Sequence, residues 1–187
     1  MNRRTFMATA LAGIGGLSTG RVRGQGAPAA PQPLRVALIG CGLQGVGVHI
    51  PALCKERLVA VVDPDKCRTD AALKRVREVS PATDVAAIRT FTDYRRLFEV
   101  MGRELDAVII ATPNHQHALP ALLAIRRGIH VYVEKPLAHT LAEVRLLTEE
   151  ARRCGVVTQM GNQGQSGEGC RLLCEYVAAG ALGQVRE

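Results

Sequence analysis

Residues 34–45 read LRVALIGCGLQG, and this stretch decides the fold. Its first six residues form a short run rich in Leu, Val and Ile, which is typical of a buried β-strand. Gly40, Gly42 and Gly45 follow at once in a Gly-x-Gly-x-x-Gly pattern, and a helical pattern begins near residue 44. A glycine-rich turn between a strand and a helix is typical of a unit that binds a dinucleotide.

The remainder of the chain alternates between apolar runs and helical stretches. Runs rich in Val and Ile predict strands at 34–39, 58–62, 107–111, 129–133 and 156–160, with a weaker one at 88–91. Helical patterns predict helices at 44–55, 65–79, 93–101, 117–127, 141–153 and 168–179. Short strands that are apolar throughout are typical of a parallel sheet covered on both faces. We therefore predict an α/β fold, a doubly wound Rossmann sheet of about six strands, with its ligand crevice at the carboxyl ends of the strands.

The turn after the first strand has the properties that a pyrophosphate site needs. Gly40 permits a tight turn, Gly42 has no side chain to keep a pyrophosphate from the backbone, and Gly45 lets helix and strand pack closely. Leu43 and Gln44 complete the turn, where the helix N-terminus presents free N–H groups to the phosphates. We expect all five residues to contact or shape the cofactor site.

Asp63 ends the second predicted strand, where dinucleotide-binding folds carry an acid. A carboxylate there accepts hydrogen bonds from both hydroxyls of an adenosine ribose and repels a 2′-phosphate, so we predict NAD as the cofactor. Arg68 is close enough in sequence to accommodate that phosphate, which keeps NADP as an alternative. Asp63 has a second interpretation, as a helix cap before Pro64.

Polar clusters follow the last three predicted strands: ATPNHQH at 111–117, VEKPL at 133–137 and QMGNQ at 159–163. The carboxyl ends of parallel strands meet at one edge, so these clusters converge on one crevice. A lysine there can stabilise a developing alkoxide or relay its proton. The alternative for Lys135 is a surface lysine that pairs with Glu134.

The segments GCGLQG, ATPNHQH, EKPL and MGNQ, in this order and spacing, resemble the Gfo/Idh/MocA oxidoreductases, the glucose–fructose oxidoreductase and inositol dehydrogenase family. The resemblance runs from residue 34 to the C-terminus. It implies that Lys135 lies by the reacting carbon and assists proton transfer. It also implies that the nicotinamide cofactor contacts Thr112, Pro113, Asn114, His117, Glu134 and Pro136. Asn162 and Gln163 are expected to face the substrate.

The resemblance implies an NAD(P)-dependent dehydrogenase that acts on a sugar or cyclitol hydroxyl. An NAD-dependent glycoside hydrolase of the same family and a non-catalytic nucleotide-binding module are the alternatives. Family members carry a second α/β domain that covers the site and often forms the oligomer interface. We expect residues 34–165 to form the cofactor domain and residues 166–187 to begin a truncated second domain. Homo-oligomers are expected only of a full-length form.

The first 33 residues have the layout of a signal peptide. Residues 2–7 read NRRTFM, an apolar run spans 8–17, and small residues fill 24–30. Adjacent arginines before Phe6 resemble the twin-arginine type, so we expect export to the periplasm or an equivalent compartment. The alternative is a disordered basic tail.

The net charge of +7 arises largely in this segment, which holds four arginines and no acid. The rest has 20 basic and 17 acidic residues. Near-balanced charge and few aromatics argue against nucleic acid as a partner and, once the signal is removed, against a membrane. The spacings of the six cysteines fit neither a zinc ribbon nor a disulfide framework, so no metal site is predicted.

Overall fold

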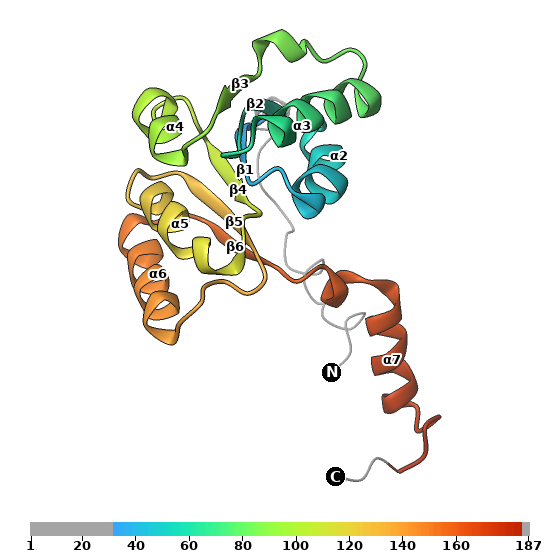
Figure 1. Ribbon diagram of the computed structural model, residues 1–187. Coiled ribbons are helices and arrows are strands. Elements are labelled where there is room, and N and C mark those ends of the chain that lie inside the picture. Colours follow the sequence, from blue (N-terminus) through green and yellow to red (C-terminus); the bar gives the residue numbers. More distant parts are fainter. Residues whose placement is uncertain (1–31, 185–187) are drawn as a thin grey trace, which may run out of the picture. The chain divides into compact units, whose positions relative to one another are not determined.

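The computed structural model describes residues 32–184, which contain a six-stranded parallel sheet (Figure 1). Its spatial order is β3-β2-β1-β4-β5-β6, and every neighbouring pair is parallel. The strands are β1 (Arg35–Ile39), β2 (Arg57–Val62), β3 (Arg89–Phe91), β4 (Ala107–Ile110), β5 (His130–Glu134) and β6 (Thr158–Gly161). The order reverses between β1 and β4, as in a doubly wound Rossmann sheet, which confirms the predicted fold class.

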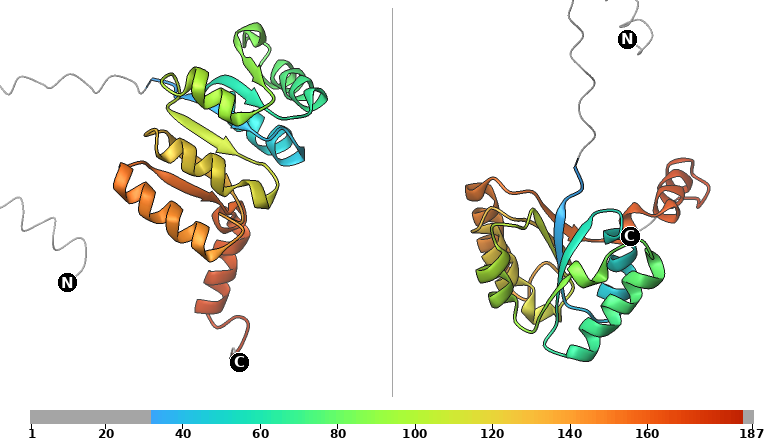
Figure 2. Two further views of the ribbon diagram at one scale, coloured as in Figure 1. Left: turned by 60° about the vertical axis from the view of Figure 1, so that its left-hand side comes forward. Right: turned by 90° about the horizontal axis from the view of Figure 1, so that it is seen from above.

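Helices cover both faces of this sheet, with α4, α5 and α6 on one side and α2 and α3 on the other (Figure 2). The helices are α2 (Ile50–Leu53), α3 (Lys66–Val79), α4 (Tyr94–Met101), α5 (Ala118–Ile125), α6 (Leu141–Cys154) and α7 (Glu168–Ala178). Short helical turns are η1 (Gly45–His49), η2 (Val85–Ala87), η3 (Asn114–Gln116) and η4 (Gln163–Ser166).

The two faces of the sheet carry separate apolar clusters. On one face, Leu97 and Phe98 of α4 and Ile125 of α5 pack against Val108 and Ile110 of β4 with other buried residues. On the other, Ile50, Ala72 and Val76 pack against Leu38 and Val61. The four inner strands β1, β2, β4 and β5 are therefore covered on both faces, which is why they are largely apolar instead of alternating, whereas the edge strands β3 and β6 are more exposed.

Both ends of α6 are set by residues within one helical turn. The Thr140 hydroxyl accepts the Glu143 N–H, and the Glu143 carboxylate accepts the Thr140 N–H, so the capping box is complete. Gly155 ends α6 with φ of +66°, and Gly128 has φ of +75°. This left-handed backbone conformation favours glycine.

Most boundaries agree with the sequence prediction to within one or two residues, and two of the differences have a clear physical cause. The helix predicted at 44–55 contains the π-helical turn η1 before α2, and its wide turn precedes Pro51. Proline has no N–H to donate, and its ring crowds the carbonyl one turn earlier, so a regular α-helix is not continued there. The strand predicted from 156 begins instead at Thr158, because the Val156 N–H still bonds to the Ala151 carbonyl as α6 ends.

Residues 166–184 hold α7, which buries no residue, and residues 179–182 after it form turns. The predicted signal segment lies outside the described residues, apart from Gln32 and Pro33. Within residues 32–184, no helix is both long and apolar enough to cross a bilayer.

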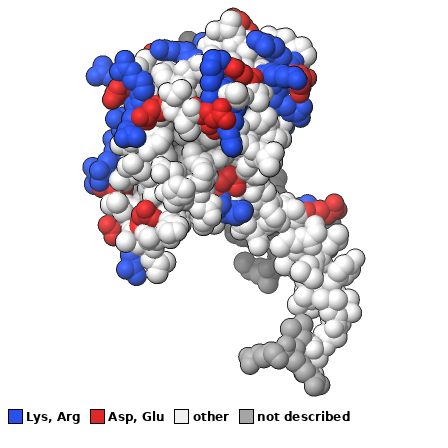
Figure 3. Space-filling view, viewed as in Figure 1, with Lys and Arg blue, Asp and Glu red and all other residues white. Residues whose placement is uncertain are grey.

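Lys and Arg are interspersed with Asp and Glu on the face in Figure 3, and pairs such as Arg96–Glu99 keep the two signs close together.

Candidate cofactor cleft and active-site edge

A cleft of about 730 Å³ opens at the carboxyl edge of the sheet, at the β1–β4 switch point. Ligand sites of doubly wound folds lie at this position. The cleft is lined by the glycine-rich turn and the segments after β2, β3 and β4: Gly40, Gly42, Leu43, Gln44, Asp63, Pro64, Asp65, Arg68, Thr92, Asp93, Tyr94, Arg95, Thr112, Pro113 and Gln116, among others. Its volume falls within the range typical of cofactor sites.

Each glycine of the turn is required for a separate geometric reason. Gly40 has φ of +97°, and a Cβ there would lie 2.5 Å from the carbonyl oxygen of Ala111. A Cβ on Gly45 would lie 2.1 Å from the Gly40 carbonyl oxygen, so helix and turn touch at this residue. A Cβ on Gly42 would meet within 4 Å only the flexible Arg68 guanidinium, at 3.3 Å. The backbone at Gly42 is therefore open to the cleft, which fits the close approach of a pyrophosphate.

Asp63 is buried, and both of its carboxylate oxygens bond to backbone N–H groups. Oδ2 accepts the Cys41 N–H at 2.9 Å and Oδ1 accepts the Asp65 N–H at 3.0 Å. The cap of α3 is Asp65 instead, which accepts the Cys67 N–H. Asp63 nevertheless lines the cleft, and a carboxylate oxygen has lone pairs for more than one donor. It can therefore hold the turn and still accept ribose hydroxyls.

The Cys41 thiol lies beside this carboxylate, between two of the glycines. Burial raises its pKa to about 12, and the Asp63 charge adds to the effect. The thiol is therefore neutral near pH 7 and does not act as a thiolate nucleophile.

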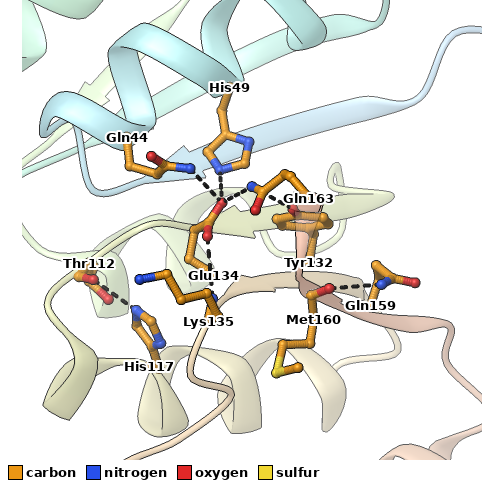
Figure 4. Close-up of polar contacts among 10 residues, drawn as sticks. All are labelled: Gln44, His49, Thr112, His117, Tyr132, Glu134, Lys135, Gln159, Met160 and Gln163. Atoms are coloured by element: carbon orange, nitrogen blue, oxygen red, sulfur yellow. Dashed lines mark hydrogen bonds and ion pairs between the residues drawn. The ribbon is translucent and has the colours of Figure 1, made fainter. Parts of the chain in front are cut away.

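Glu134, the last residue of β5, is the centre of a buried polar cluster (Figure 4). Its Oε1 accepts hydrogen bonds from the side chains of Gln44, His49 and Gln163. Burial by itself raises the pKa of Glu134, but these three donors outweigh burial and leave the pKa below its usual value. Glu134 is therefore an ionised carboxylate near pH 7.

Gly161 leaves the room that this cluster needs. A Cβ at that position would lie 2.7 Å from the Tyr132 hydroxyl and 2.9 Å from Glu134 Oε2. The Tyr132 hydroxyl accepts an N–H of Gln163, 3.1 Å away. Burial raises the pKa of Tyr132, as does the Glu134 charge. Both effects keep the phenol protonated.

Lys135 follows Glu134 directly and is exposed. Figure 4 shows its side chain beside Glu134, and its backbone N–H donates to Glu134 Oε2 at 3.3 Å. The Lys135 ammonium group makes no ion pair within residues 32–184. The alternative in which Lys135 is a surface lysine paired with Glu134 is therefore wrong. The Lys135–Pro136 peptide bond is cis.

His117 lies beneath the cleft instead of in its lining. It is buried, with Nδ1 2.6 Å from the Pro136 carbonyl oxygen and Nε2 2.8 Å from the Thr112 carbonyl oxygen. It thereby ties the loop after β4 to the loop after β5. Of the other predicted cofactor residues, Asn114 is exposed outside the cleft lining, as is Pro136, whereas Thr112 and Pro113 line it.

The predicted residues therefore fall into two neighbouring groups. The cleft gathers Gly40, Gly42, Leu43, Gln44, Asp63, Thr112 and Pro113. The cluster around Glu134 gathers Gln44 and Gln163, with Lys135 at its edge, while Asn162 precedes Gln163 and is exposed. Gln44 belongs to both groups. Sequence reasoning missed His49 and Tyr132, because each meets Glu134 or Gln163 only through the tertiary fold.

Residues 34–162 match the family model described as the oxidoreductase family with an NAD-binding Rossmann fold. The chain belongs to the Gfo/Idh/MocA oxidoreductases. Its cofactor domain is therefore an NAD-binding one, as predicted. Among the residues that the structure describes, no group of His, Cys, Asp or Glu side chains is arranged to hold a metal.

Three individual proteins illustrate the similarity. The D-glucoside 3-dehydrogenase of Escherichia coli K12 is 30% identical over 82% of this chain and 41% of its own length. A glycosyl hydrolase family 109 protein of Shewanella sp. MR-4 is 28% identical over 99% of this chain and 44% of its own. The structure of scyllo-inositol dehydrogenase from Lactobacillus casei, with bound NAD(H) and scyllo-inositol, aligns with a TM-score of 0.66 at 20% identity. That alignment covers 82% of this chain and 43% of that one. The chain thus spans less than half the length of these relatives.

Proposed function

We propose that this chain provides the cofactor domain of an NAD-dependent dehydrogenase that oxidises a hydroxyl of a sugar or cyclitol. The observation that carries the proposal is the adjacency of an NAD cleft and an exposed lysine at one sheet edge, joined through Gln44 and Glu134. The family membership and the dehydrogenases among the relatives support it.

The proposed chemistry divides between the two groups of residues. The glycine-rich turn at Gly40 and Gly42 lets the pyrophosphate approach the backbone. Asp63 accepts hydrogen bonds from the adenosine ribose and thereby favours NAD over NADP. The bound nicotinamide supplies the hydride acceptor. Lys135 takes up or relays the proton of the reacting hydroxyl, while Asn162 and Gln163 lie on the substrate side.

Lys135 separates cofactor binding from turnover, so its variant tests this division. We expect Lys135→Ala to leave the Kd for NAD within about threefold, because the cleft lining does not include it, and to lower turnover by at least about 100-fold. NADH formation from a panel of sugars and cyclitols measures turnover, with Lys55→Ala as the matched control. Equal loss of NAD binding in Lys135→Ala and Asp63→Ala would refute the division of roles.

A glycoside hydrolase that uses NAD is a second candidate, because the family 109 relative aligns with nearly the whole chain. There the cofactor oxidises the sugar transiently, so that an adjacent proton becomes acidic and the glycosidic bond eliminates. Release of a chromogenic leaving group without net NADH supports this candidate, whereas NADH from a free sugar supports the dehydrogenase. A chain that binds NAD and does neither is the non-catalytic module.

We also propose that the protein is exported through the twin-arginine route. The support is the order of features in residues 1–33: paired arginines, an apolar run, then small residues. Replacing Arg3 and Arg4 with lysine should retain the protein in the cytoplasm, as measured by fractionation. Unchanged export of that variant contradicts the route.

A further inference from the structure

His49 and Glu134 form a buried pair that the proposed chemistry does not use. Each residue is 5% exposed, and Nε2 of His49 lies 2.8 Å from Oε1 of Glu134. An ionised carboxylate only accepts hydrogen bonds, so Nε2 must carry the hydrogen. His49 ends η1, the segment that continues directly from the glycine-rich turn. The pair therefore connects the cofactor turn to the end of β5.

The same carboxylate joins three further segments of the site. Gln44 donates to Oε1 from the glycine-rich turn, and Gln163 donates to it from the turn after β6. The other oxygen, Oε2, accepts the backbone N–H of Lys135 at 3.3 Å. Figure 4 shows the side chains of Gln44, His49 and Gln163 pointing at the same oxygen atom of Glu134. Glu134 is thus the point at which the cofactor turn, the substrate-side turn and the lysine loop meet.

We propose that His49 is a positioning residue: it holds the Glu134 carboxylate between the glycine-rich turn and the Lys135 loop, and so fixes Lys135 relative to the bound dinucleotide. This inference rests on the proposed role of Lys135 in proton transfer. His49 touches neither cofactor nor substrate in this arrangement and acts only through Glu134.

The charge on Glu134 is what makes this role measurable. The titratable side chains next to its carboxylate are His49, Tyr132 and Lys135. Burial favours the neutral acid, and the N–H donors favour the carboxylate. Removing the His49 donor leaves the burial and only two side-chain donors. Glu134 then takes up a proton at higher pH, and its hold on the Lys135 N–H weakens.

The backbone amide of Lys135 reports this change directly, because it donates to Glu134. The chain has four lysines, Lys55, Lys66, Lys74 and Lys135, so ¹⁵N-lysine labelling gives few signals, and Lys135→Arg assigns the relevant one. In the unaltered protein we expect the chemical shift of the Lys135 amide to titrate with a midpoint below the usual pKa of a glutamate. In His49→Leu the midpoint should rise by about one pH unit or more.

Three further variants complete the test. His49→Gln restores an amide donor near the position of Nε2 and should return the midpoint to its original value. His49→Asn is too short to reach Oε1 and should behave like His49→Leu, which provides a second reading if the leucine variant does not fold. His139→Leu, at an exposed histidine, is the matched control and should change nothing.

An unchanged Lys135 midpoint in both His49→Leu and His49→Asn overturns the inference. A midpoint that rises in His49→Gln as much as in His49→Leu also overturns it, because the donor is then not the cause. None of these readings requires turnover. NADH formation therefore tests only the proposed function, and the amide titration decides the role of His49 by itself.

Discussion

The carboxylate of Asp63 accepts the backbone N–H of Cys41, 2.9 Å away, so the end of β2 is bonded to the glycine-rich turn after β1. The two strands are neighbours in the sheet, and their carboxyl ends form one wall of the cleft. One side chain therefore braces the turn and faces the ribose position.

Replacing Asp63 is expected to weaken NAD binding specifically. Asp63→Ala loses both ribose hydrogen bonds and the brace on Cys41, so the Kd for NAD should rise by about 10-fold to 100-fold. Asp63→Asn keeps part of the brace but not the charge, and should narrow the preference for NAD over NADP. Isothermal titration with both dinucleotides measures this. Asp70→Ala, an exposed acid on α3, is the control, and an equal effect there contradicts the assignment.

Two glycines of η1 offer a matched pair of substitutions. A Cβ at Gly45 would lie 2.1 Å from the Gly40 carbonyl oxygen, whereas a Cβ at Gly47 meets nothing within 4 Å. Gly45→Ala should destabilise the fold by about 1–3 kcal/mol and reduce NAD affinity, because the turn must shift. Gly47→Ala should leave both unchanged or slightly improved. Thermal unfolding with and without NAD compares them, and identical behaviour of the two variants is the contrary result.

Replacing the buried His117 is expected to destabilise the fold, whereas replacing its exposed neighbour His115 is not. His117→Ala removes the ring that lies between the Thr112 and Pro136 carbonyl oxygens and leaves at least one of them without its N–H donor, at a cost of about 1–3 kcal/mol. The loop after β4 and the loop after β5, which holds Lys135, then separate more easily. Urea unfolding of His117→Ala and His115→Ala gives the comparison. A His115 effect as large as that of His117 argues against this interpretation.

An acid-sensitive contact joins the first and fourth strands at their amino ends. Hydrogen bonds from the Arg35 side chain, then its backbone N–H, lower the pKa of Asp106 to about 2. The pKa of an unfolded aspartate is about 3.9, so the stabilisation is present above that pH and is lost as the pH falls towards the folded value. Between pH 3.9 and the folded pKa of about 2, the free energy of unfolding of Asp106→Asn should fall less steeply with decreasing pH than that of the unaltered protein. Parallel slopes contradict the contact.

Local patterns predicted much of this fold because each signal lies within a few residues. The apolar runs predicted all six strands, and the helical pattern at 141–153 predicted α6 to within one residue. The wide turn η1 was missed, since helical periodicity continues through Pro51 and does not show which carbonyl loses its partner. The strand β6 starts late because the end of α6 takes up Val156.

The site was predictable only where a motif carried it. The glycine-rich turn and Asp63 are adjacent through the topology of neighbouring strands, which the order of elements implies. The Glu134 cluster is different, because Gln44, His49 and Gln163 reach one oxygen from distant parts of the chain. No spacing rule links His49 to Glu134, so only the packed structure reveals the pair.

Titration of the purified protein with NAD and with NADP tests the central claim most directly. We predict saturable binding of NAD, weaker binding of NADP, and a higher melting temperature in the presence of NAD. If neither dinucleotide binds at any concentration up to the millimolar range, the cleft at the β1–β4 switch is not a cofactor site and the account is wrong.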